Sequence, residues 1–344
     1  MKSRIGLLAL ALVVSVSAPA AITFNLSYLA GTSAQQQTAF QQAAARWSNI
    51  FNDNITINLT VGTASLGSGI LGSTGSPSVG VSYSSFRSAL IADATSANDT
   101  TATSNLQAGP SLTVRTNRWS NNPNGNNSVT PYTATLTNMA ITRANAKAIG
   151  ILGATDTASD GSITFTTNTS TLPSGGYSYT PGSVASNQID FVGIATHEIG
   201  HALGFVSGVD AVDGGGNGAD NASAWVRPMD LYRFSSTSGT NPDLTAGTPA
   251  KYFSLDKGVT GQSVTFSTGV ADGDGNQASH WKDSLGLGIM DPTASNGETL
   301  AISANDIKMF DVIGYNLAPV PEPATMVAFG LGALAVMRRR KNRS

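Results

Sequence analysis

The 344-residue chain contains no cysteine. This absence excludes disulfides, thiolate metal ligands, a cysteine nucleophile and inhibition by a cysteine held on a metal. Histidine is also scarce, with three in the chain, and charged residues make up only 12%. Sparse charge together with abundant Gly, Ser, Thr, Asn and Ala is typical of a loop-rich, partly β, secreted protein rather than a helical cytosolic one.

Basic residues are few in the middle of the chain. Residues 21–317 hold 12 Lys and Arg against 20 Asp and Glu, a formal charge of −8, whereas both ends are basic. We find no basic stripe and no interleaving of aromatic with basic residues, so we expect no nucleic-acid partner. Hydrophobic residues, at 40%, are sufficient for a core, and the length suits one large or two modest domains.

The first twenty residues have the pattern of a secretory signal peptide. Lys2 and Arg4 precede an apolar run from Ile5 to Val16, and Ala18-Pro19-Ala20 offers small residues for cleavage. The apolar run is short for a membrane span. We therefore expect signal peptidase to remove residues 1–20.

The C-terminus, PVPEPATMVAFGLGALAVMRRRKNRS, combines a turn, an apolar run and a basic cluster in that order. Pro321–Pro323 is followed by fourteen mostly apolar residues, Ala324–Met337, and then by three arginines and Lys341. As a helix the run would measure about 21 Å, short of a ~30 Å hydrocarbon core. We therefore expect only transient membrane contact, with the basic cluster on the cytoplasmic side.

This C-terminal segment resembles the PEP-CTERM sorting signal of Gram-negative bacteria. The resemblance implies export across the inner membrane and removal of the tail by an exosortase-type enzyme. It also implies delivery to the cell envelope, the surface or the extracellular matrix.

Between the two ends, hydrophobic periodicity predicts a mixture of strands and helices. Strands are expected at residues 21–28, 55–61, 112–115 and 163–167. Helices are expected at 33–51, 83–92, 138–153, within 188–204 and at 303–314. The first strand, helix and strand suggest a βαβ start. Three stretches rich in Ser, Thr, Asn, Gly and Pro are expected to be loops: 95–110, 117–131 and 168–187.

The segment HEIGHALGF, residues 197–205, has the spacing of a zinc site. On a helix, His197 and His201 project from one face a single turn apart and can hold one zinc ion between them. Glu198 can act as general base on a water bound to that zinc, because the metal lowers the pKa of the water towards ~7. Gly204 is expected to end the helix.

A zinc site of this kind needs a third protein ligand, since catalytic sites typically use three plus water. Ser207 stands where many zinc proteases of this type have a third histidine, and serine is a poor ligand at neutral pH. His280, in ASHWKDSLGLGIMDP, is the remaining histidine. Asp210 and Asp213 offer oxygen donors closer in sequence, so the residues alone leave the third ligand open.

The order HEIGHALGF, a long insertion, SHW and then GIMDP resembles the metzincin metalloproteases, specifically the leishmanolysin-like branch. In that branch the third histidine lies far downstream and a methionine follows in a tight turn beneath the metal. The resemblance spans residues 197–290, and the N-terminal half matches only in its order of strand, helix and strand. It implies the following roles: zinc ligands His197, His201 and His280, general base Glu198, turn-forming Gly204 and Met-turn residue Met290.

The resemblance also implies an α+β fold, with a twisted mixed sheet, an active-site helix and an irregular C-terminal subdomain that contains the Met-turn. The expected division is a signal peptide at 1–20, an N-terminal subdomain with the zinc helix at 21–206, a C-terminal subdomain at 207–317 and a sorting segment at 318–344. A tyrosine supports the oxyanion in some metzincins, but Tyr315 lies in the closing helix, where we expect a core role.

The function implied by the resemblance is an exported zinc-dependent endopeptidase that acts on protein or peptide substrates. The alternative is a catalytically inactive structural or binding protein of the surface or matrix that keeps the fold. The intact Glu198 favours the enzyme, because an inactive descendant has no need of that carboxylate.

The loop DGDGNQ, Asp272–Gln277, has oxygen ligands at alternate positions, as at the start of a calcium loop. It departs from that pattern at the sixth position, where Gln277 replaces glycine, and at the twelfth, where Asp283 replaces glutamate. A Ca²⁺ site and a solvated turn are therefore both open here, as they are for the loop Asp210–Asp220.

Overall fold

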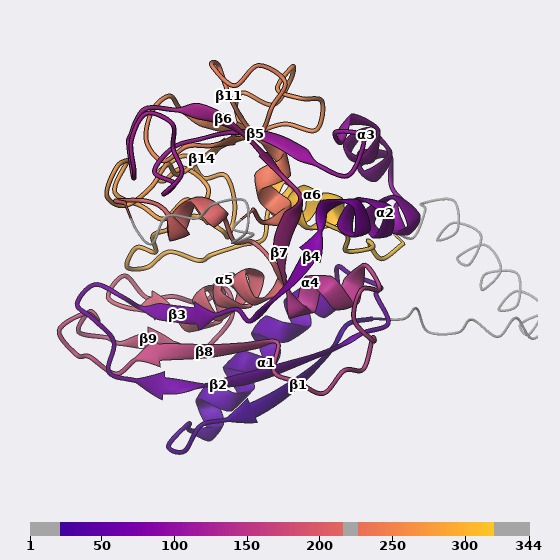
Figure 1. The fold of residues 1–344 in the computed structure, drawn as a ribbon. Helices are drawn as coiled ribbons and strands as arrows, with labels where there is room; N and C mark the ends of the chain where they lie inside the picture. Colours follow the sequence, from indigo (N-terminus) through magenta and orange to yellow (C-terminus); the bar gives the residue numbers. More distant parts are fainter. Residues whose placement is uncertain (1–20, 216–225, 320–344) are drawn as a thin grey trace, which may run out of the picture.

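The structure is a computed structural model, and it describes residues 21–215 and 226–319. The expected signal peptide and nearly all of the sorting segment lie outside these residues. Figure 1 shows a twisted sheet with two long helices in one part of the molecule and several short sheets joined by long loops in the other. The fold is α+β.

The largest sheet has four strands in the order β1 (Thr23–Tyr28), β2 (Thr56–Ala64), β8 (Gly161–Thr166) and β3 (Gly72–Gly75). The first three strands are parallel, and β3 pairs antiparallel with β8 at the edge. Alternate residues of β2 are buried, as the apolar spacing of ITINLTV requires. The predicted βαβ start is confirmed, because helix α1 (Ala34–Ser48) connects the neighbouring parallel strands β1 and β2.

Helix α1 (Ala34–Ser48) begins at Ser33, whose side chain and that of Gln36 form a capping box. Its buried face packs against α5 (Phe191–Leu203), the helix that carries the HEIGH motif. The indole Nε1–H of Trp47 donates to the carbonyl oxygen of Thr196 at 2.9 Å. This bond ties α1 to the backbone of α5 at the residue before His197.

Helix α5 is enclosed by the rest of the protein, and His201 is its only residue that is not buried. Asp190 caps the first turn by accepting a hydrogen bond from the Gly193 N–H at 2.9 Å. The helix ends at Gly204 with φ +130°, a backbone conformation that favours glycine. The predicted end of the histidine helix is therefore confirmed.

Within the described part of the chain, the remaining strands form four small sheets. Most of them lie above the main sheet in Figure 1, whereas β9 lies beside β3 and β8. They are β4 (Ser78–Ser82) with β7 (Asn138–Thr142), β12 (Asp243–Leu244) with β5 (Leu112–Thr116) and β6 (Tyr132–Leu136), β11 (Arg233–Ser235) with β13 (Lys251–Phe253) and β14 (Thr265–Phe266), and β9 (Tyr177–Ser178) with β10 (Ile189–Asp190). The pairing of β12 with β5 joins segments from both expected subdomains in one sheet, and the division at residue 206 stays a prediction.

The shorter helices are α2 (Tyr83–Asp93), α3 (Ala97–Asn105) and α4 (Arg143–Ala148), with 3₁₀ turns η1 (Gly208–Ala211) and η2 (Pro228–Tyr232). Two sequence expectations are wrong here. Residues 138–153 are not one helix: Met139 and Ile141 are buried in β7, which pairs with β4, and α4 starts only after Thr142.

The stretch 95–110 is not a loop, because it contains α3. Its Ser and Thr content suggested a loop, but Ser96 and Asp99 form a capping box that starts the helix. Helix α3 then packs against α2 and against α6 (Ala304–Val312), so tertiary contacts outweigh a weak local preference.

Helix α6 (Ala304–Val312) closes the fold, capped by Ser303 as expected and followed by Gly314 with φ +108°. Tyr315 is buried, and its hydroxyl donates to the carbonyl oxygen of Leu203 at 2.6 Å. The expected core role of Tyr315 is confirmed. Within the described ranges, no helix has both the length and the apolar character needed to cross a membrane.

Candidate metal centre

The structure brings together all three histidines of the chain. Their Nε2 atoms lie 3.0 Å (His197 to His201), 3.2 Å (His201 to His280) and 3.3 Å (His197 to His280) apart. Two of the side chains come from α5, while His280 comes from the segment that follows β14. A residue 79 positions downstream of His201 thus completes the cluster.

The opposite nitrogen of each ring faces a backbone carbonyl. The Nδ1–H groups of His197 and His201 donate at 2.7 Å to the carbonyl oxygens of Ile289 and Phe205, and that of His280 donates to Gln277 at 3.2 Å. Because a carbonyl only accepts, each Nδ1 carries the proton and each Nε2 keeps its lone pair. Three lone pairs therefore point at one spot with no hydrogen atom between them.

Such an arrangement suits a cation. Zinc bound tetrahedrally to histidine at roughly 2.0–2.1 Å places neighbouring nitrogen atoms roughly 3.3–3.4 Å apart. The observed separations of 3.0–3.3 Å lie at or just below this range, so the three imidazoles could hold one metal ion with a fourth position left open. Within residues 21–215 and 226–319, this is the only cluster of three or more His, Cys, Asp or Glu side chains arranged to hold a metal.

Burial keeps the three imidazoles neutral. Desolvation lowers the pKa of His197 to about 4 and that of His280 to about 3. The hydrogen bonds to the backbone carbonyls act in the opposite direction and raise both pKa values. The pKa of His201 is well below its usual value, first because of burial and then because of the two neighbouring imidazoles. Neutral imidazole is the form that ligates a metal.

Glu198 lies next to the cluster and is only 5% exposed. Burial raises its pKa to about 7, although a hydrogen bond from Thr74 works in the opposite direction. The Thr74 hydroxyl lies 2.6 Å from the Oε2 atom of Glu198. A Cβ at Gly72 would lie 2.5 Å from Oε1, so the edge strand β3 binds this carboxylate through Thr74 and leaves room for it at Gly72.

The side chains considered as rival ligands are engaged elsewhere. The Ser207 hydroxyl donates to Asp230 at 2.6 Å. Asp210 accepts hydrogen bonds from the N–H groups of Ala278 and Ser279. Asp210 therefore holds the segment that carries His280 and does not join the metal cluster.

Asp213 binds the backbone of the same loop further from His280, at Ala271 and Asp272. Its two carboxylate oxygens accept from the N–H groups of Ala271 and Asp272 at 2.8 and 2.9 Å. Asp210 and Asp213, which follow α5 and were candidates for the third ligand, thus bind backbone N–H groups within residues 271–279. This arrangement leaves His280 as the residue that meets His197 and His201.

Met290 lies beneath α5. It is fully buried, and a Cβ at Gly200 would lie 2.5 Å from its sulfur. Its carbonyl oxygen accepts from the Trp281 N–H at 3.0 Å, and the preceding residue, Ile289, accepts from His197. The turn that contains Ile289 and Met290 is therefore hydrogen-bonded to His197 and to Trp281, the neighbour of His280.

Comparison with known proteins gives one match, at the C-terminus. Residues 319–341 match the PEP-CTERM protein-sorting motif. No curated protein matches the chain, and no solved structure does. The motif supports an exported protein of the Gram-negative cell envelope or surface whose tail is recognised by an exosortase-type sorting enzyme.

The acidic loop considered for calcium uses its carboxylates internally. Asp272 forms an ion pair with Arg118, and Asp274 forms one with Lys282 at 2.7 Å. These cations and the nearby backbone N–H groups occupy the oxygens that a calcium ion would need. The geometry of the described residues thus favours a structured turn at Asp272–Gln277.

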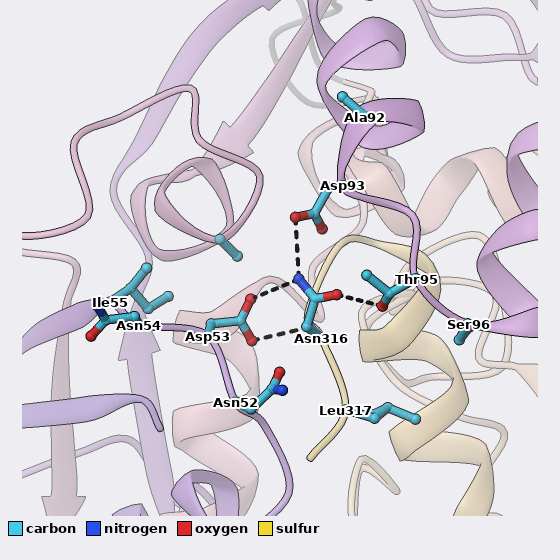
Figure 2. Close-up of a pocket in the computed structure, with 11 residues that line it drawn as sticks. Asn52, Asp53, Asn54, Ile55, Ala92, Asp93, Thr95, Ser96, Asn316 and Leu317 are labelled. Carbon is cyan, nitrogen blue, oxygen red and sulfur yellow. Dashed lines mark hydrogen bonds between the residues drawn. The ribbon is translucent and has the colours of Figure 1, made fainter. Parts of the chain in front are cut away.

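A separate pocket of about 630 Å³ lies where the chain leaves the described fold. Figure 2 shows Asp53, Asp93 and Thr95 grouped around the amide of Asn316. Burial raises the pKa of Asp53 to about 7 and that of Asp93 to about 6. The pocket contains no histidine, and its hydrogen bonds join the C-terminal segment to the α1–β2 and α2–α3 connections.

Sequence reasoning missed two residues of the site. Thr74 lies in the short, glycine-bounded strand β3, for which no strand was expected. Asp306 touches the methionine turn from α6, where its position suggested only a helix start. The single local signal was the spacing Ser303-x-x-Asp306, which indicates a cap and no more.

Proposed function

We propose that the chain is an exported zinc-dependent endopeptidase of the metzincin type, with the leishmanolysin-like arrangement of a distant third histidine. The observation that supports this most strongly is the convergence of three Nε2 lone pairs beside a buried glutamate. Export is supported by the sorting motif at residues 319–341.

The proposed residue roles follow from the contacts. His197, His201 and His280 would hold the metal through Nε2, each oriented by its carbonyl partner. When bound, zinc would supply Lewis-acid polarisation of a carbonyl and a lowered pKa for water. Glu198 would take the proton from the attacking water and return it to the leaving amine, since burial raises its pKa to about 7.

The position of β3 supports a peptide as the substrate class. Among the residues that the structure describes, this strand lies at the edge of the main sheet and pairs on one side only, with β8. Its Thr74 touches Glu198, so an extended peptide paired with the free edge would run past the general base. Backbone pairing with a sheet edge is a common way to bind extended peptides.

The test is hydrolysis of casein or of a peptide library by the exported protein loaded with zinc. Glu198→Gln is expected to keep its zinc and lose activity by about 100-fold or more, because general-base catalysis contributes at least that factor. Glu298→Gln is the matched control, since that carboxylate only accepts from the Ser295 N–H. Zinc-loaded wild type that cleaves nothing would favour the structural or binding alternative, and an active Glu198→Gln protein would refute the mechanism.

A further inference from the structure

Asp306 is a fully buried carboxylate at the start of α6. Its two oxygens accept four N–H groups, and three of these belong to the segment 281–290. The donors are the Trp281 indole at 2.8 Å, the Ile289 N–H at 2.8 Å, the Met290 N–H at 3.3 Å and the Ser303 N–H at 2.7 Å. A helix cap requires only the last of them.

One peptide unit separates Asp306 from His197. The peptide between Ile289 and Met290 receives the His197 Nδ1–H on its carbonyl oxygen, and its own N–H donates to Asp306. The carboxylate therefore orients and polarises the group that fixes the ring and the proton of His197. Partners of this kind raise the basicity of a metal-ligating histidine and lock its tautomer.

A second connection runs from Asp306 to His280. The indole of Trp281 donates to Asp306, and the backbone N–H of Trp281 donates to the Met290 carbonyl. Trp281 directly follows His280. A single carboxylate therefore restrains both ends of the loop between His280 and Met290. The close approach explains Gly288, where a Cβ would lie 2.2 Å from the Asp306 Oδ2 atom.

We propose that Asp306 is the positioning residue of the metal centre, acting on His197 through the Ile289–Met290 peptide and on His280 through Trp281. This inference rests on the metal centre of the proposed function. It assigns Asp306 no contact with metal or substrate.

Asp311 is a matched control on the same helix. It is also fully buried, and it accepts from Ser96 and Asn98 at 2.9 Å each, towards α3. Asp311→Asn therefore perturbs a buried carboxylate of α6 without touching the route to the histidines.

The experiment titrates Co²⁺ and Zn²⁺ into the metal-free full chain and its variants. It records metal affinity and the visible Co²⁺ absorption bands, with circular dichroism and thermal melting to monitor the fold. Asp306→Asn is expected to bind Zn²⁺ about 10–100-fold more weakly than wild type, the usual cost of losing such a partner, and to shift the Co²⁺ bands. Asp311→Asn should keep wild-type affinity and bands, even where it lowers the melting temperature.

Trp281→Phe provides a second variant if Asp306→Asn does not fold. It removes one donor to Asp306 and keeps an aromatic ring in place, and we expect weaker Zn²⁺ binding and shifted Co²⁺ bands. Wild-type affinity and bands in a folded Asp306→Asn protein, or in Trp281→Phe when the former does not fold, would overturn the role of Asp306 and leave the metal centre standing. Wild type that binds neither ion would overturn the proposed function itself.

Discussion

Gly200 and Met290 approach so closely that a Cβ at position 200 would lie 2.5 Å from the methionine sulfur. Gly200 lies on α5 between the two histidines of the HEIGH motif, and Met290 is fully buried below it. A side chain at position 200 would push the helix and the methionine turn apart. The glycine thus sets the distance between two elements that both carry parts of the metal centre.

Gly200→Ala is expected to lower the free energy of unfolding by about 1–3 kcal/mol, the usual cost of overpacking a core, and to weaken zinc binding. Denaturant unfolding and a zinc titration measure the two effects. Gly80→Ala is the control, because a Cβ there meets nothing within 4 Å. Adding Met290→Ala should recover part of the loss by making room, and strictly additive effects would contradict direct contact.

Thr74→Val should impair catalysis more than folding. The substitution removes the hydroxyl that lies 2.6 Å from the Glu198 carboxylate while keeping the shape of the side chain. We expect kcat to fall about tenfold or more, because hydrogen bonds to charged groups contribute about 1.5–3 kcal/mol, and zinc content to stay unchanged. Thr74→Ser should restore activity. Equal kcat for Thr74→Val and wild type would show that this contact is incidental.

Asp210→Asn should distinguish a positioning carboxylate from a metal ligand. Asp210 holds the backbone N–H groups of Ala278 and Ser279, so its replacement is expected to weaken zinc binding without changing the number of histidine ligands. Zinc content after dialysis and X-ray absorption at the zinc edge measure these two properties. Complete loss of zinc together with an unchanged fold would indicate that Asp210 itself ligates the metal.

The carboxyl of Asp53 should make stability fall as the pH rises. Its folded-state pKa is about 7, against an ordinary value of 3.8, so the folded protein binds this proton more tightly than the unfolded chain. The stabilisation is complete below about pH 4 and is lost as the pH rises through 7. Asp53→Asn should therefore reduce the slope of melting temperature against pH in this window, and an unaltered slope would argue against a protonated Asp53.

Local signals in the sequence were sufficient for part of the fold. Ser33 and Ser303 mark helix starts, Gly204 marks a helix end, and the spacing of apolar residues in β2 and α1 indicates their buried faces. The same reasoning failed for α3, whose Ser and Thr residues favour turns, and for β7, whose pairing with β4 is not visible in its own residues.

The candidate site likewise contains residues that the sequence identified and residues that it did not. His197, Glu198 and His201 form a motif within five positions, whereas His280 was identified through a family resemblance. Thr74 and Glu198 are 124 positions apart. The contact between Asp306 and Met290 depends on a turn that cannot be recognised from either residue alone. Hydrogen bonds between distant segments depend on the whole fold, so no local pattern indicates them.

The zinc content of the exported protein after dialysis, compared between wild type and His280→Ala, tests the central claim most directly. Asp213→Ala is the control, because Asp213 lies close to the helix in sequence yet binds only backbone N–H groups. The account predicts about one zinc per chain in wild type and in the control, and loss of zinc in His280→Ala with an unchanged circular dichroism spectrum. Full zinc retention by His280→Ala would contradict the three-histidine centre.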